Sequence, residues 1–63
     1  MTVGAQGTDA QADAIKRLTK RHGELSISHF DSLGRLVVYL PGDEEPRRRR
    51  RFITRSGVVE RGN

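Results

Sequence analysis

Five consecutive arginines, residues 47–51, are the segment of this 63-residue chain whose composition points most clearly to a chemistry. Guanidinium groups this close together repel one another, so they must stay solvated or meet an anion, and nucleic acid is the commonest polyanion in cells. Arginine also donates paired hydrogen bonds to phosphates, which lysine cannot do. We therefore expect exposed side chains that contact a nucleic-acid backbone at Arg47, Arg48, Arg49, Arg50, Arg51 and Arg55.

A second basic group lies nearer the N-terminus and includes Lys16 and Lys20, which we add to the predicted interface, beside Arg17 and Arg21. Taken alone, this group is typical of an ordinary exposed helix face. The charge of the chain is nevertheless uneven. Residues 1–46 carry five basic and seven acidic side chains, for a net charge of −2, whereas residues 47–63 carry seven arginines and one glutamate, for a net charge of +6.

The arginine run has other interpretations. It could be a solvated charge run that prevents edge-to-edge association of sheets. It could dock on an acidic protein surface, which would make the chain a protein-interaction module or an inhibitor, or it could meet an acidic neighbour in a larger assembly. Salt-dependent affinity for any duplex would favour nucleic acid, and because no groove-reading helix is recognisable, that binding should be weakly specific. Stoichiometric capture of one acidic protein would favour the alternative.

The sequence offers no set of residues for catalysis. Acyl transfer needs a nucleophile, a base and an orienting acid that converge in a pocket, and the chain has two histidines and no cysteine. His22 falls at the expected end of a helix and His29 near the end of a strand, without metal-ligand spacing. We expect no enzyme activity, no metal and no cofactor. Tyr39 and Phe52 could stack on bases, but in a chain with few large apolar residues we expect them in the core.

The clearest element is an N-terminal helix from about Asp9 to His22. Thr8 followed by Gln11 matches a capping box, and Gly23 supplies a residue suited to the helix end. Acidic residues lie early and basic residues late, as the helix dipole favours. Its apolar stripe has only two large members, Ile15 and Leu18, so the helix should cover one side of a sheet.

The period then changes from helical to alternating, which predicts a β-hairpin. Residues 24–30 and 35–40 form its strands, and Gly34 lies in the connection. Both faces of residues 35–40 are apolar, so this should be the central strand. The segment from Pro41 to Pro46 should be an exposed acidic loop.

Residues 47–55 fit a third strand, in which Arg49, Arg51 and Arg55 would form one row, or a helix capped by Asp43 and ended by Gly57. We favour the strand, because only Phe52 and Ile53 would give a helix an apolar surface and Pro46 disfavours helical angles at Glu45.

The sequence thus predicts an α+β fold, an N-terminal helix packed on a small three-stranded antiparallel β-sheet. Residues 1–7 are expected to be a disordered lead-in, 8–60 a single domain and 61–63 a tail. Without a membrane segment or signal-peptide pattern, we expect a cytoplasmic location. A small core without disulfides also favours a homodimer.

Overall fold

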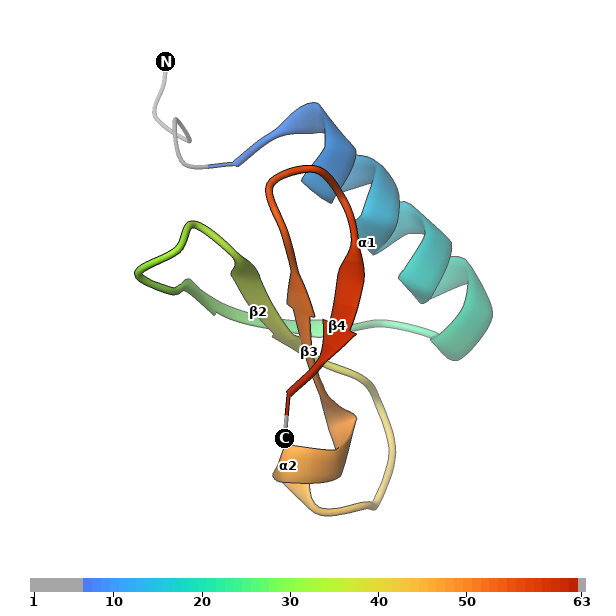
Figure 1. Ribbon diagram of the computed structural model, residues 1–63. Coiled ribbons are helices and arrows are strands. Elements are labelled where there is room, and N and C mark those ends of the chain that lie inside the picture. The colour runs from blue at the N-terminus through green and yellow to red at the C-terminus, as the bar shows by residue number, and fades with distance from the viewer. Residues whose placement is uncertain (1–6, 63) are drawn as a thin grey trace.

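The chain folds into one long helix and a four-stranded sheet in the computed structural model, which describes residues 7–62 (Figure 1). The α+β class is therefore confirmed, whereas the expected three strands are wrong by one. In chain order the elements are α1 (Asp9–His22), β1 (Ser26–Phe30), β2 (Leu36–Tyr39), α2 (Pro46–Arg49), β3 (Arg50–Ile53) and β4 (Val59–Arg61).

Helix α1 has the limits and the caps that the sequence predicts. The Thr8 hydroxyl accepts from the backbone N–H of Gln11 at 3.1 Å, and the Gln11 side-chain oxygen accepts from the backbone N–H of Thr8 at 3.0 Å. At the other end Gly23 adopts a positive φ of 103° and donates to the Thr19 carbonyl. Because both caps are local, the sequence alone sets the length of this helix.

The sheet is an antiparallel meander with the strand order β1-β2-β3-β4. Strands β1 and β2 form the predicted hairpin, whose turn is closed by the Asp31 carboxylate accepting from the backbone N–H groups of Leu33 and Arg35. Strand β2 is interior, and Leu36, Val37 and Val38 are all buried, as two apolar faces require. The exposed acidic loop after it is also confirmed.

The strand that sequence reasoning missed is β4, which pairs with β3 from Val59 to Arg61. Its three residues are all exposed. They therefore show no alternation of buried and exposed positions from which a strand could be predicted. The connecting turn is held by the Thr54 hydroxyl, which accepts from the backbone N–H of Val58 at 3.0 Å. Strand β4 also reaches into residues 61–63, the expected tail, and Gly62 is buried.

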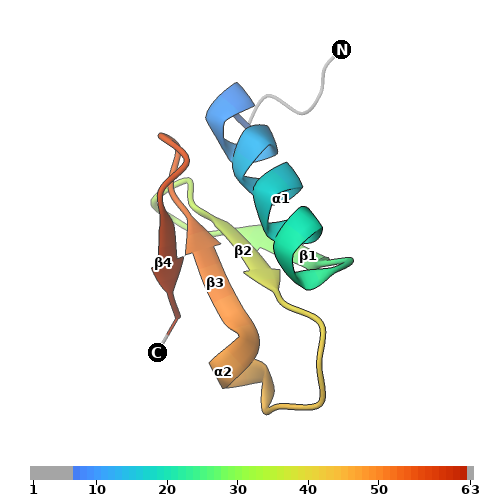
Figure 2. The same ribbon diagram turned by 90° about the vertical axis from the view of Figure 1, so that its right-hand side faces the viewer.

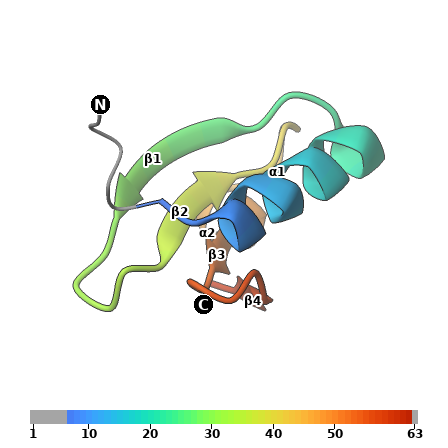
Figure 3. The same ribbon diagram turned by 90° about the horizontal axis from the view of Figure 1, so that it is seen from above.

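The core lies between α1 and one face of the sheet (Figures 2 and 3). Its buried members are Ala14, Leu36, Val38 and Ile53, and the two large residues predicted for the helix stripe, Ile15 and Leu18, pack against them. A polar side chain joins them, because the Gln11 amide is 1% exposed and donates to the carbonyls of Gly34 and Ile53 at 3.0 Å each. This side chain therefore fixes α1 to β3 while completing the helix cap.

Helix α1 also contacts the turn between β3 and β4. The Thr8 hydroxyl donates to the Arg55 carbonyl at 2.7 Å, and Arg17 donates to the Gly57 carbonyl at 3.5 Å. Gly57 has a φ of 90°, and a Cβ at this position would lie 2.9 Å from the Ala10 carbonyl oxygen. Only glycine allows the turn to approach the helix this closely.

The expectations for residues 1–6 and 63 lie outside the described residues. Between residues 7 and 62, no helix combines the length and the apolar composition needed to cross a membrane.

Candidate functional site

The arginine run is divided between two elements, so neither interpretation of residues 47–55 was complete. Pro46 begins the single turn of α2. Proline has no backbone N–H, but at the start of a helix this N–H would have no partner within the helix, so no hydrogen bond is lost. Asp43 does not cap this turn, because Glu45 is the N-cap residue and no side chain bonds there. Arg50 then turns into β3, opposite Tyr39. The predicted row of Arg49, Arg51 and Arg55 does not form, since Arg49 lies in α2 and Arg55 beyond β3.

Three members of the run are half-buried, which corrects the expectation that all five are exposed, and two of them, Arg49 and Arg50, contact other parts of the chain. Arg49 is half-buried and donates to the carbonyls of Glu44 at 2.7 Å and Leu40 at 3.2 Å, so it ties α2 to the acidic loop. Arg50 is half-buried beside Gly62 and donates to its carbonyl at 3.4 Å. The Nε of Arg50 is buried without a hydrogen-bond partner among the described residues.

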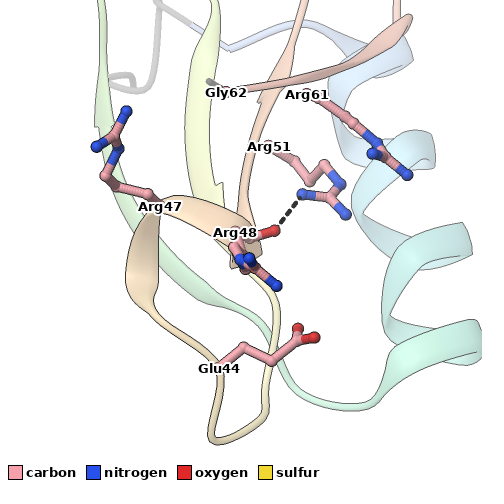
Figure 4. A pocket seen from close by; sticks show the side chains of 6 residues that line it. All are labelled: Glu44, Arg47, Arg48, Arg51, Arg61 and Gly62. Atoms are coloured by element: carbon pink, nitrogen blue, oxygen red, sulfur yellow. Dashed lines mark hydrogen bonds between the residues drawn. The ribbon is translucent and has the colours of Figure 1, made fainter.

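The remaining arginines line an open hollow of about 380 Å³ at the α2 end of the sheet. Figure 4 shows Arg48, Arg51 and Arg61 gathered on one side of this hollow with Glu44, while Arg47 extends to the other side, away from α1. The last lining residue is Gly62. Arg47, Arg48 and Arg61 are exposed and Arg51 is half-buried.

Strand register explains why Arg51 and Arg61 lie together. Arg51 is directly opposite both Val38 of β2 and Arg61 of β4, and opposite residues in an antiparallel sheet share a face. Both arginines therefore lie on the face that α1 covers, beyond the part that the helix occupies. Sequence reasoning missed Arg61, because only its pairing with β3 brings it to the run; recognising the hairpin around Gly57 would have been the one usable signal.

These arginines form no ion pair with a carboxylate within residues 7–62. Within residues 7–62 both ion pairs belong to Arg35, which contacts Asp31 at 2.7 Å and Glu60 at 3.1 Å. Glu44 borders the hollow without an ion pair to the arginines around it. Like charges at close range raise the affinity of a surface for anions, so the hollow is a site suited to a phosphate or a carboxylate.

The basic residues of α1 do not line the hollow. The bond from Arg17 to Gly57 shows that the Arg17 side of the helix faces the β3–β4 hairpin. Lys20 and Arg21 follow Arg17 by three and four residues, so they lie on that side too, whereas Lys16 lies farther round the helix. Lys16, Lys20 and Arg21 are all exposed.

Arg55 is the predicted site residue that the structure keeps apart from the others. It is exposed in the β3–β4 turn, with its side chain beside Gly34, whereas α2 lies at the opposite end of β3. Arg55 therefore does not line the hollow.

Both histidines are exposed, His22 as the last residue of α1 and His29 on β1. The Nδ1 of His29 is hydrogen-bonded to the Ser28 hydroxyl at 2.8 Å. No group of three metal-ligating side chains occurs in the part of the chain that the structure describes. Comparison of the chain with known protein families, with curated proteins and with solved structures found no match.

Proposed function

We propose that this protein binds nucleic acid through the phosphate backbone, and that the binding surface is the hollow formed by Arg48, Arg51 and Arg61. The observation that carries the proposal is that these three arginines, which come from α2, β3 and β4, line one hollow with no acidic partner among the described residues. Lys20 and Arg21 of α1 extend the surface toward the helix.

A polyanion fits this surface better than an acidic protein does. The centres of protein interfaces are enriched in aromatic residues and methionine as well as in arginine, whereas the lining here is four arginines, a glutamate and a glycine. No apolar or aromatic side chain is available in it as an anchor. Contacts of this kind position a nucleic-acid backbone but do not read its sequence, and the single turn of α2 is too short to read a groove.

The test measures affinity for a duplex DNA of mixed sequence, by fluorescence anisotropy, from about 50 to 300 mM salt, the range in which counterion release is resolved. The double variant Arg48→Gln with Arg61→Gln should weaken binding and make the slope of log affinity against log salt shallower by about two. Its thermal melt should not change, since both side chains are exposed and make no hydrogen bond within the described residues.

A charge-matched control is the double variant Arg55→Gln with Lys16→Gln, which removes two positive charges outside the hollow and should change the slope much less. Glu44→Gln removes the one carboxylate that borders the hollow and should tighten binding. Equal effects of the two double variants would show that only net charge matters and would contradict this site. Absence of any binding at about 50 mM salt, where phosphate contacts are strongest, would overturn the function itself.

A further inference from the structure

The face of the sheet opposite α1 carries both aromatic side chains that the sequence analysis placed in the core. Phe52 lies opposite Val37, and Tyr39 lies opposite Arg50, in the alternate positions to the core residues Leu36, Val38 and Ile53. That core expectation is therefore wrong: neither ring belongs to the helix-side cluster, and both are half-buried. Figures 2 and 3 show α1 on the other side of the sheet, and no described element covers this face.

The ring of Phe52 lies beneath two guanidinium groups. The Arg35 guanidinium carbon lies 4.4 Å from the ring centroid, and that of Arg50 lies 5.5 Å from it. Asp31 and Glu60 hold Arg35 in place by ion pairs of 2.7 and 3.1 Å, and the Gly62 carbonyl accepts from Arg50. This face therefore presents two guanidinium groups held by these contacts and, opposite Arg50 in the strand register, the Tyr39 ring.

The charge at this face selects the kind of molecule that could lie on it. Arg47 extends away from α1 at the α2 end of the sheet (Figure 4) and makes no ion pair within residues 7–62. The acidic groups Asp31 and Glu60 are both occupied by Arg35. A surface with aromatic rings, guanidinium planes and a free positive charge suits a molecule that is flat, π-rich and anionic. Bases on a phosphodiester backbone have these properties.

We propose that this face stacks the unpaired bases of single-stranded nucleic acid, with Tyr39 as one stacking position and the guanidinium planes above Phe52 as the other. The inference rests on the function proposed above, in which the arginines at the α2 end hold the backbone. A duplex cannot use the face in this way, because its bases are stacked on one another and expose only their edges. Single strands should therefore bind more tightly than duplexes with equal numbers of phosphates in contact.

The decisive experiment compares the wild-type protein on three probes, a 15-nucleotide oligothymidylate, an abasic strand of the same length and a duplex. The abasic strand keeps every phosphate and lacks every base. Stacking contributes about tenfold or more in affinity per base, so the oligothymidylate should bind at least about tenfold more tightly than the abasic strand. Equal affinity for the two strands would overturn the proposal while leaving backbone binding intact.

Variants of Tyr39 locate the effect on this face. Tyr39→Leu removes the ring and should weaken oligothymidylate binding about tenfold, without changing affinity for the abasic strand. Tyr39→Phe is the matched control, because it keeps the ring and should keep the affinity. A fluorescent base analogue in the strand should be quenched by the wild type and by Tyr39→Phe but not by Tyr39→Leu.

The other outcomes are also decisive. If Tyr39→Leu lowers the sedimentation mass and leaves the preference for bases unchanged, a second copy of the chain covers this face and the proposal is wrong. Failure of every probe to bind would instead overturn the proposed function, and this inference with it.

Discussion

Arg51 donates from Nη1 to the backbone carbonyl of Arg48, with a distance of 2.8 Å between the two atoms. The same nitrogen donates to the carbonyl of Arg50 at 2.9 Å. A hydrogen bond to a backbone carbonyl thus holds these two positively charged residues together, without an acidic side chain between them. The guanidinium of Arg51 is held at one nitrogen while its other donors remain available to the hollow, so less conformational entropy is lost when an anion binds.

Neighbouring arginines of one run should differ in their effect on stability. Arg49→Gln removes charged donors from the carbonyls of Glu44 and Leu40, and should lower the free energy of unfolding by about 1–2 kcal/mol. Arg47→Gln is the control, since Arg47 is exposed, and should change stability by less than about 0.5 kcal/mol. Urea unfolding measures both. Equal losses would mean that Arg49 does not hold α2 in place.

Leu18 should contribute to the stability of the fold although it is only partly buried. It packs against the buried cluster as one of the two large apolar residues of the α1 stripe, so Leu18→Ala should destabilise the fold by about 2 kcal/mol. Leu33→Ala makes the same change at a position that is 69% exposed and should have little effect. A thermal melt in which the two variants behave alike would show that α1 does not pack on the sheet as described.

Lowering the pH should destabilise the fold because Asp31 becomes protonated. Desolvation raises the pKa of this carboxyl, but hydrogen bonds from Arg35 and Leu33 and the charge of Arg35 outweigh it, so the pKa lies below its ordinary value. A group of this kind stabilises the fold above its unfolded pKa of about 3.9, and the contribution is lost as pH falls through the folded value.

The measurement is the melting temperature between about pH 2 and pH 6, a window that brackets the unfolded pKa of an aspartate. The wild type should lose stability below about pH 4, and Asp31→Asn should be less stable at pH 6 and should lose less as the pH falls. Asp43→Asn, in the exposed loop, should follow the wild type. An Asp31→Asn curve parallel to the wild-type curve would contradict this role.

Self-association remains a prediction, and the structure suggests where it would occur. Strand β1 is an edge strand and Ile27 on it is 59% exposed; unpaired edges favour pairing with another chain. The melting temperature should rise with protein concentration, and Ile27→Lys should remove that rise. A monomer mass by sedimentation at high concentration, with a concentration-independent melt, would refute the dimer.

Elements with local signals were predictable from the sequence. Helix α1 and the hairpin of β1 and β2 depend on Thr8, Gln11, Gly23 and Gly34, whose capping and turn contacts are made with residues at most a few positions away. Strand β4 was not predictable in the same way. Its three residues are exposed, so its position comes from pairing with β3 and not from a pattern of its own.

The sequence predicts which kind of residue makes up the candidate site, but it does not predict how those residues are arranged. The run itself shows that positive charge is concentrated after Pro46. Which arginines serve the fold depends on carbonyls that only the folded chain brings near, those of Leu40 and Glu44 for Arg49 and that of Gly62 for Arg50. Arg61 enters the site through strand register alone.

The contact between α1 and the β3–β4 turn has a consequence for how the chain folds. A 14-residue helix is only marginally stable by itself in water. The bonds from Thr8 to Arg55 and from Arg17 to Gly57 span 47 and 40 residues of sequence, so α1 is stabilised by a segment that follows it far along the chain. Residues 55–57 must therefore be present before the helix is secured, and we expect α1 and the β3–β4 turn to form together rather than stepwise.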